Sequence, residues 1–467
     1  MENTELRNQQ DQKIAIIMGL IDENEMEALT AILKKMQAVE VAEILKELTE
    51  EQLLEVLPVF EDEDLGYIAS NMDIELLVEL FDKVDRRFYA SMVTNMSSDV
   101  RADLYQHLEK ERQLELLPYL DKKTREDVIH LSSYPPETAG SIMVTDFATV
   151  KEGMTVAQAL EKIRKDAPTK KMIYYVYVVD EHMKMKGFVT LKDLIMAEPG
   201  TLVKDVLHED FIYADVYEDR ESAAVKIEKY DMVAIPVLNP LKQLAGIVRH
   251  DDALDVIRAE HTEDLEKFMG IVHDPAAEEL NYMETSPIQH FKKRVIWLAT
   301  LSILGLLTGM VIHRFEEAIA SLVVLALYMP MVADTGGNTG SQAATVVIRA
   351  MALGQVKLKQ WGKIIFKEAR ISILLAIVIG TITFGKVLFL SWDVALPGDL
   401  TLSFIGVGIA FALSLQVISA TLIGASLPLI VRSFGGDPAV AASPAITTLV
   451  DITGLLIYFG VASLLFF

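Results

Sequence analysis

Apolar residues three and four positions apart dominate the first part of the chain. They recur between about Gln9 and Ser133 in short segments separated by polar breaks, as at residues 76–81. This spacing predicts amphipathic helices. The sequence LLEVLP at residues 53–58 returns as LELLP at residues 114–118. The pattern favours an all-α helical-repeat domain over residues 1–133, with an ordinary helical bundle as the alternative.

The pattern changes after residue 133 to alternating strands and helices, including a β-rich run at residues 173–179. Two stretches within this part align with each other. KGFVTLKDLI at residues 186–195 matches AGIVRHDDAL at residues 245–254. We therefore expect a tandem pair of α/β modules over residues 134–257.

The last part of the chain has apolar runs long enough to cross a membrane. A span needs about 20 mostly apolar residues, and the candidates are residues 295–312, 318–348, 371–390, 402–431 and 441–467. They predict a five-helix transmembrane domain over residues 291–467.

Basic residues indicate the orientation of these spans. They precede the first span at residues 292–294 and recur between the second and third spans at residues 357–370, which predicts a cytoplasmic N-terminus and an outer C-terminus. An odd number of spans makes an internal inverted repeat awkward within one chain. We therefore expect a homodimer around a shared pore.

Charge separates the two parts of the chain. Residues 291–467 carry 12 Lys+Arg and 8 Asp+Glu, a net charge of +4, so the other 31 basic and 59 acidic residues leave −28 on residues 1–290. That charge repels nucleic acid and attracts cations. The absence of cysteine excludes disulfides and thiolate catalysis and is typical of a reducing cytoplasm. The sequence has no phosphate-cradling GxxxxGK[ST] loop and no recognisable activated nucleophile, so we do not expect an enzyme.

Asp451 is a candidate pore residue. It lies about ten residues into the last span, roughly 15 Å deep at about 1.5 Å per residue. A carboxylate at that depth costs several kcal/mol unless it faces water or a cation, so Asp451 predicts an ion pathway. The spans themselves are expected to contact membrane lipid. The alternative is an aspartate satisfied by the hydroxyls of Thr447, Thr448 and Thr453.

The second candidate span contains MPMVADTGGNTGSQ at residues 329–342. We expect its proline and glycines to interrupt the helix and to free backbone carbonyls, at Pro330, Gly336, Gly337 and Gly340. Asn338 adds a neutral oxygen. Such a pore suits a hard cation that keeps much of its water, Mg2+ above all, with Ca2+, Mn2+ and Na+ left open.

An acidic segment links the soluble part to the first span. Residues 251–266 hold seven carboxylates against a lone Arg258. Glu260, Glu263 and Asp264 share one helical face at i, i+3 and i+4, where their repulsion would be reversed by a bound divalent cation. The alternative is a solvated acidic face.

The α/β pair resembles CBS domains, which commonly regulate transporters and enzymes by binding nucleotides or ions. Thr190 and Asp193 keep the spacing that CBS domains use toward ribose. The resemblance implies a nucleotide site there, with ATP as a regulator. Arg249 replaces the usual Thr or Ser in the second half, and purely structural pairing is the alternative.

Several motifs together resemble the MgtE family of magnesium channels over essentially the whole chain. They are GGNTGSQ, a DP pair, SPAITTLVDITGLLIYF at residues 443–459, the CBS pair and the helical N-terminal domain. The resemblance implies that Asp451 coordinates hydrated Mg2+ at a dimer axis and that Asp437 lies near the cytoplasmic mouth. Ser443 departs from the Asn of some members, which affects the expected fine selectivity.

The resemblance also implies a gate, in which cytosolic Mg2+ between the CBS domains and a connecting (plug) helix within residues 258–290 closes the pore. The implied ligands are Asp252, Asp255, Glu260, Glu263 and Asp264, with Asp219, Glu221 and Asp231 on the CBS side and Asp99 in the N-terminal domain. We expect a Mg2+ uptake channel in the cell membrane. Alternatives are an importer mainly of Co2+ or Mn2+, and a membrane-anchored CBS nucleotide sensor that transports nothing.

Overall fold

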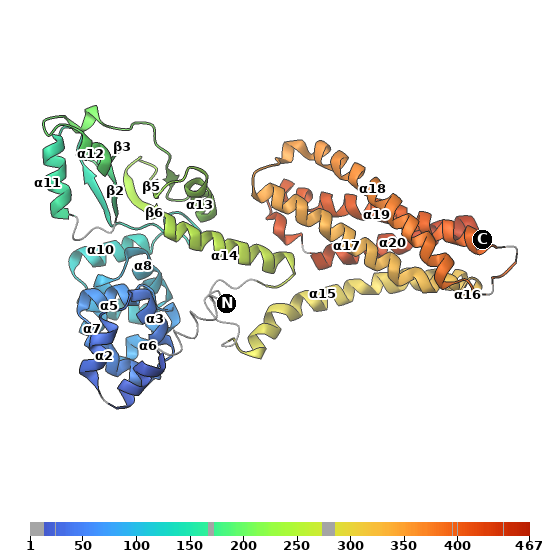
Figure 1. The fold of residues 1–467 in the computed structure, drawn as a ribbon, viewed down its shortest axis with the longest axis horizontal. Helices are drawn as coiled ribbons and strands as arrows, with labels where there is room; N and C mark the ends of the chain where they lie inside the picture. Colours follow the sequence, from blue (N-terminus) through green and yellow to red (C-terminus); the bar gives the residue numbers. More distant parts are fainter. Residues whose placement is uncertain are drawn as a thin grey trace. The chain divides into compact units, whose positions relative to one another are not determined.

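The computed structural model describes residues 14–23, 25–166, 172–272, 285–394, 396–398, 400–441 and 443–467. The chain divides into two compact units, Met1–Arg258 and Ala259–Phe467 (Figure 1). Each unit is treated by itself below. Residues 273–284 of the predicted connecting segment lie outside the described residues.

The first unit begins with short helices whose lengths follow the polar breaks in the sequence. They are α2 (Met26–Leu33), α3 (Ala38–Lys46), α4 (Glu50–Val56), η1 (Leu57–Val59), α5 (Asp62–Ala69), α6 (Ile74–Lys83), α7 (Arg86–Asn95), α8 (Ser98–His107), α9 (Lys110–Leu116), η2 (Leu117–Tyr119) and α10 (Lys122–Leu131). Helix α3 packs against α5, α5 against α7, α6 against α8, and α8 against α10. Contacts between helices two apart are typical of stacked repeats, so the predicted helical-repeat domain is confirmed.

The repeated Leu-Pro motif has the same structure in both copies. In each, an α-helix gives way to a single 3-10 turn with proline near its start, at Pro58 in η1 and Pro118 in η2. Proline suits this first turn because it has no N–H to donate.

Two aromatic side chains lie at the centre of the domain, where the rings of Phe81 and Tyr89 meet edge to face with their centroids 5.1 Å apart.

The rest of the first unit holds two similar three-stranded sheets. Their elements are β1 (Phe147–Val150), α11 (Val156–Asp166), β2 (Met172–Val179), β3 (Met185–Thr190), α12 (Leu191–Met196) and η4 (Val203–Asp205), then β4 (Ala214–Asp215), α13 (Arg220–Lys229), β5 (Ala234–Leu238), β6 (Leu244–Arg249) and α14 (His250–Phe268). Each sheet pairs its first two strands in parallel and its last two antiparallel. Gly187 pairs with Val178 in one sheet as Gly246 pairs with Val237 in the other. The predicted tandem repeat is confirmed.

The second unit is helical. It holds the end of α14, then α15 (Pro287–Arg314), α16 (Glu316–Ser321), α17 (Val324–Ala352), η6 (Leu358–Gln360), α18 (Trp361–Leu390), α19 (Leu402–Ser433), η7 (Pro438–Val440) and α20 (Ser443–Phe466). Among the described residues, four helices, and not the predicted five, are long and apolar enough to cross a membrane: α15, α18 with the turn before it, α19 and α20. Helix α17 has the length, at 29 residues, but carries the polar GGNTG stretch. The predicted span 318–348 is divided between α16 and α17.

The predicted interruption of this span at its glycines is wrong, because α17 is continuous. The glycines serve close helix packing instead. A Cβ on Gly336 would lie 2.2 Å from Nε2 of Gln416, and one on Gly337 would lie 2.8 Å from Thr447. A Cβ on Gly424 of α19 would lie 2.0 Å from the carbonyl oxygen of Gly340. Small residues let membrane helices approach this closely. Pro330 is likewise accommodated within the helix.

Candidate functional site

Asp451 is the ninth of the 24 residues of α20 and is half-buried. Its Oδ1 atom is shielded from solvent and has no hydrogen-bond partner in the part of the chain that the structure describes. The neighbouring threonine hydroxyls are used elsewhere: those of Thr447, Thr448 and Thr453 donate to the backbone carbonyls of Ser443, Pro444 and Val450. The carboxylate therefore keeps its capacity to bind a cation or water.

Helix α17 has two contrasting faces. Gly336, Gly337 and Gly340 are buried against α19 and α20. Asp334, Asn338 and Gln342, at i, i+4 and i+8, are exposed on the single chain, and we call them the polar face of α17. Lipid would not solvate these groups, so the polar face requires water or another protein surface.

Asp334 is a membrane carboxylate that the sequence analysis missed. It lies on α17, which packs against the helix that carries Asp451, so the two acidic residues are on neighbouring helices. The reasoning that singled out Asp451, an acidic residue inside an apolar span, applied equally to Asp334. Carboxylate oxygens are the hard ligands that a hydrated divalent cation prefers.

A second group of charges lies where α14 meets η7. Asp437 caps η7 by accepting the N–H of Ala439 at 2.9 Å, and its other oxygen accepts a hydrogen bond from Nζ of Lys267 at 2.9 Å. Lys267 also forms an ion pair with Glu263. With Asp264, these residues form what we call the mouth cluster: Glu263, Asp264, Lys267 and Asp437.

The next residue, Phe268, attaches the end of α14 to the helices of the second unit. Its ring packs against a cluster formed by Ala344 of α17, Ala420 of α19, and Ile446 and Val450 of α20. The same turn is fixed by a hydrogen bond from the N–H of Val272 to the carbonyl of Lys293. The connecting helix therefore ends on the helices that carry Asp334 and Asp451.

The mouth cluster has an excess of negative charge. Burial raises the pKa of Asp264, and the charges of Asp437 and Glu263 raise it further. Burial opposes the charge of Lys267, but its hydrogen bonds with Glu263 and Asp437 raise its pKa above the usual value. The mouth cluster thus has one ammonium group, that of Lys267, for three carboxylates. The sequence analysis missed Lys267, although its i+4 position from Glu263 was a usable signal.

Within the first unit, the structure brings Asp99 and Asp252 around Arg249. Arg249 donates to both carboxylate oxygens of Asp252, at 2.8 and 2.6 Å, and lies 3.4 Å from Asp251. Burial raises the pKa of Asp252 to about 6, with Asp99 adding to the rise and Arg249 opposing it. Oδ1 of Asp99 is buried with no partner in the described part of the chain. The carboxylate oxygens of Asp99 and Asp252 fit a hard cation, but the Asp252 carboxylate is already paired with Arg249.

The other implied sensor ligands are more scattered. Asp219 caps α13 by accepting the N–H groups of Glu221 and Ser222. Asp231 lies just after α13 in a left-handed conformation with φ of 49°. Asp255 is exposed and pairs with Arg258 at 3.4 Å. Glu260, Glu263 and Asp264 belong to the second unit, so the implied ligand set is divided between the two units.

Thr190 and Asp193 form a capping box at the start of α12. The Thr190 hydroxyl donates to Asp193 at 2.6 Å, and the ring of His208 lies 2.9 Å from the same carboxylate oxygen. In the second half, Arg249 and Asp252 occupy the equivalent positions after β6. The two halves therefore present different chemistry at the same place in the fold.

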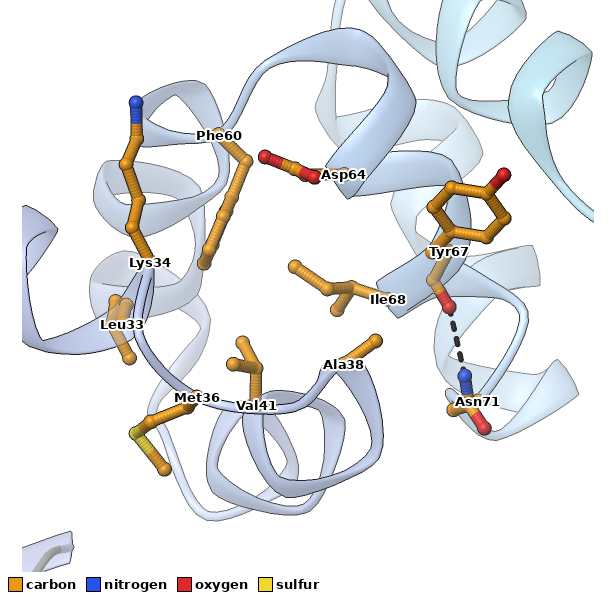
Figure 2. A pocket seen from close by; sticks show the side chains of 10 residues that line it. All are labelled: Leu33, Lys34, Met36, Ala38, Val41, Phe60, Asp64, Tyr67, Ile68 and Asn71. Carbon is orange, nitrogen blue, oxygen red and sulfur yellow. Dashed lines mark hydrogen bonds between the residues drawn. The ribbon is translucent and has the colours of Figure 1, made fainter. Parts of the chain in front are cut away.

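A cavity of about 280 Å3 lies in the helical-repeat domain (Figure 2). Apolar side chains, including Phe60 and Ile68, cover much of its lining, and Asp64 is its only carboxylate. Asn71 donates to the backbone carbonyl of Tyr67 at 2.8 Å beside it. None of the predicted cation or nucleotide ligands lines this cavity, and one carboxylate is a poor site for a divalent cation.

Three family models cover most of the chain. Residues 329–461 match MgtE, described as a divalent cation transporter, and residues 36–137 match the MgtE intracellular N domain. Residues 139–200 and 203–259 each match the CBS domain. The ranges of these matches agree with the helical, α/β and C-terminal helical parts of the structure.

Known proteins resemble the chain over most of its length. A magnesium transporter MgtE of Thermus thermophilus is 39% identical over 79% of this chain and 80% of its own. A magnesium transporter MgtE of Bacillus subtilis is 31% identical over 97% of both chains. The cytosolic domain of the Mg2+ channel MgtE, solved in complex with ATP, is 30% identical with a TM-score of 0.50 and covers 52% of this chain and 99% of its own. The soluble part of a magnesium transporter is 28% identical with a TM-score of 0.51, over 54% of this chain and 99% of its own. The chain belongs to the MgtE family of divalent cation transporters.

Proposed function

We propose that the protein is a homodimeric, Mg2+-selective channel for magnesium uptake, closed by Mg2+ on its cytosolic side. The observation that carries the proposal is Asp451, the one charged residue of α20, whose Oδ1 has no hydrogen-bond partner among the described residues. Its relatives are named magnesium transporters. No nucleotide hydrolysis is required, because two charges crossing about 100 mV gain roughly 4.6 kcal/mol.

The polar face of α17 supports the dimer. Asp334, Asn338 and Gln342 are exposed on one chain at a depth where lipid cannot solvate them. A second copy related by two-fold symmetry would bring two such faces together around water. We therefore place Asp451, Asp334 and Asn338 of both chains along the ion path, with Asp437 at its cytoplasmic mouth.

For the gate, we propose that cytosolic Mg2+ binds carboxylates of the mouth cluster and of the Asp99–Asp252 region. The oxygen of Asp99 that has no partner among the described residues and the excess negative charge around Lys267 support this role. Bound cations would bridge these carboxylates, as well as reduce their repulsion, and so favour a compact, closed state. Asp219, Glu221, Asp231, Asp255 and Glu260 are proposed as further ligands.

We assign residues 1–133 to the helical-repeat region and residues 134–257 to the CBS pair. Residues 258–290 are then the connecting region, and residues 291–467 the pore region. We also place the N-terminus in the cytosol and the C-terminus outside. A cysteine placed near Phe467 would then react with an impermeant reagent added outside intact cells. Labelling only after permeabilisation would overturn the topology.

ATP is a second candidate ligand of the CBS pair. The solved cytosolic domain in complex with ATP supports it, and Thr190 and Asp193 are the proposed contacts. Calorimetry with ATP on the full chain should show binding that Asp193→Ala weakens. No heat with the wild-type protein would remove ATP from the proposal.

A flux assay tests the function directly. The full chain is placed in liposomes with a Mg2+-sensitive dye, and uptake is measured with and without competing Co2+ or Mn2+. We expect saturable Mg2+ uptake that excess Co2+ and Mn2+ inhibit only weakly. Preferred uptake of Co2+ or Mn2+ would favour a different cargo, and no uptake of any divalent cation would favour a nucleotide sensor without transport.

A further inference from the structure

Gln416 is an unusual residue for the middle of α19. Its side chain is fully buried, with 0% exposure, in a helix dominated by apolar residues. A buried amide in a membrane helix is costly unless its polar atoms are bonded. The ion path proposed above does not use Gln416, so its role requires another explanation.

Both ends of the Gln416 amide are bonded. Its Nε2 donates to the backbone carbonyl of Val450 on α20 at 2.9 Å, and the hydroxyl of Ser419 lies within hydrogen-bond distance of its Oε1, at 3.2 Å, and of the backbone carbonyl of Gln416, at 3.0 Å. Val450 directly precedes Asp451 in the chain. The hydrogen bond therefore fixes the backbone of α20 next to the candidate pore carboxylate.

Two glycines on different helices, Gly336 and Gly454, make room for this amide. A Cβ on Gly336 of α17 would lie 2.2 Å from Nε2, and a Cβ on Gly454 of α20 would lie 2.3 Å from the same atom. Any side chain at either position would require the amide or the helix to move. Gln416 thus lies as a wedge between the helix that carries Asp334 and the helix that carries Asp451.

We propose that Gln416 is a positioning residue for the pore: its amide sets the spacing and rotation of α17 and α20, and so the placement of the Asp451 carboxylate on the ion path. The inference rests on the proposed function, because it requires Asp451 to face the ion. It assigns Gln416 no direct contact with the ion, since the side chain has no exposed surface.

The test compares full-length variants in liposomes. Gln416→Met keeps the length of the side chain but removes the donated hydrogen bond. We expect the protein to remain a folded dimer while the ratio of Mg2+ to Co2+ uptake falls about fivefold, because a small misplacement of a binding group weakens discrimination more than it weakens assembly. Ser414→Ala is the matched control, since that hydroxyl is bonded on the α18 side of the same helix.

A double-mutant cycle tests the wedge geometry independently. Gly454→Ala alone should reduce Mg2+ uptake strongly, because its methyl group collides with the amide. The same change in a Gln416→Ala background should add little, because the amide is gone. Equal effects in the two backgrounds would overturn the wedge.

The outcomes separate this inference from the function on which it rests. If Asp451→Asn abolishes uptake but Gln416→Met leaves both rate and ion preference unchanged, the positioning role is wrong and the channel proposal stands. If Asp451→Asn transports normally, the assignment of the pore fails first. A rate loss in Gln416→Met with unchanged ion preference would indicate a packing role and would also overturn the inference.

Discussion

Asp451 and the carboxylates that pair with Lys267 and Arg249 lie in contrasting surroundings. On α20, Asp451 has an oxygen with no partner among the described residues. Two other carboxylates are already paired: Asp437, before η7, accepts a hydrogen bond from Lys267 of the connecting helix at 2.9 Å, and Asp252 of the α/β region accepts one from Arg249 at 2.6 Å. An unpartnered carboxylate binds a cation by losing only water, whereas a paired one must also give up an ion pair. The first arrangement suits rapid passage, and the second suits a site that responds to concentration.

The largest effect should come from the unpartnered carboxylate. Asp451→Asn keeps the shape of the side chain but removes its charge, and we expect Mg2+ uptake to fall at least about a hundredfold, as losing roughly 3 kcal/mol of ion stabilisation implies. Uptake into liposomes measures it. Asp393→Asn, an exposed acidic residue between α18 and α19, is the matched control and should transport normally. Equal Mg2+ uptake by the two variants would show that the Asp451 carboxylate has no special role in transport.

Neutralising the connecting helix should abolish regulation and leave conduction intact. In Glu260→Gln/Glu263→Gln/Asp264→Asn, currents should persist at millimolar cytosolic Mg2+, about tenfold above those of the wild type, because the sites that hold the closed state are lost. Patch-clamp recording with Mg2+ titrated on the cytosolic face gives the curve. Closure at the wild-type concentration would show that these carboxylates do not sense the ion.

Removing the ammonium group of Lys267 should have a smaller effect on the current. Lys267→Met breaks the ion pairs to Asp437 and Glu263, so the end of α14 is held less tightly when Mg2+ is scarce. We expect a rise of about two- to fivefold in current at low cytosolic Mg2+, as losing an ion pair of roughly 0.5–1 kcal/mol implies. Lys363→Met, on the exposed surface of α18, provides the control. Unchanged current at low Mg2+ would show that the pair has no part in gating.

The smallest effect should be on stability. The pKa of Asp252 is raised to about 6 in the folded state, so between about pH 4 and 6 the folded protein binds more protons than the unfolded chain. Stability should therefore fall as pH rises through this window. Denaturant unfolding of residues 1–258, which form a unit of their own, measures it.

In Asp252→Asn this part of the pH dependence should disappear. Asp255→Asn should retain it, because that carboxylate is exposed. If the two variants gave the same profile, the burial of Asp252 would not be the cause.

The periodicity of apolar residues predicted the helices and strands better than it predicted which side chains of distant elements contact one another. The tandem α/β modules and the stacked helices followed from local patterns, because their strands and helices bury apolar faces next to each other in sequence. The glycines of α17 were misread as a break, because their role depends on Gln416 and Thr447, which lie far away in the chain. Lys267 and Asp437 are likewise 170 residues apart. Such pairings depend on tertiary packing, which spacing alone does not specify.

The polar face of α17 has a consequence for how the protein enters the membrane. An aspartate at the centre of a helix costs roughly 2.5–3.5 kcal/mol on insertion, and α17 falls short of the apolarity that the other four long helices reach. Its buried face packs against α19 and α20, which begin at Leu402 and Ser443 and are synthesised later. We therefore expect α17 to insert stably only once those helices have emerged. Assembly of the pore would then be coupled to completion of the chain, so that a truncated protein could not form a leaking pathway.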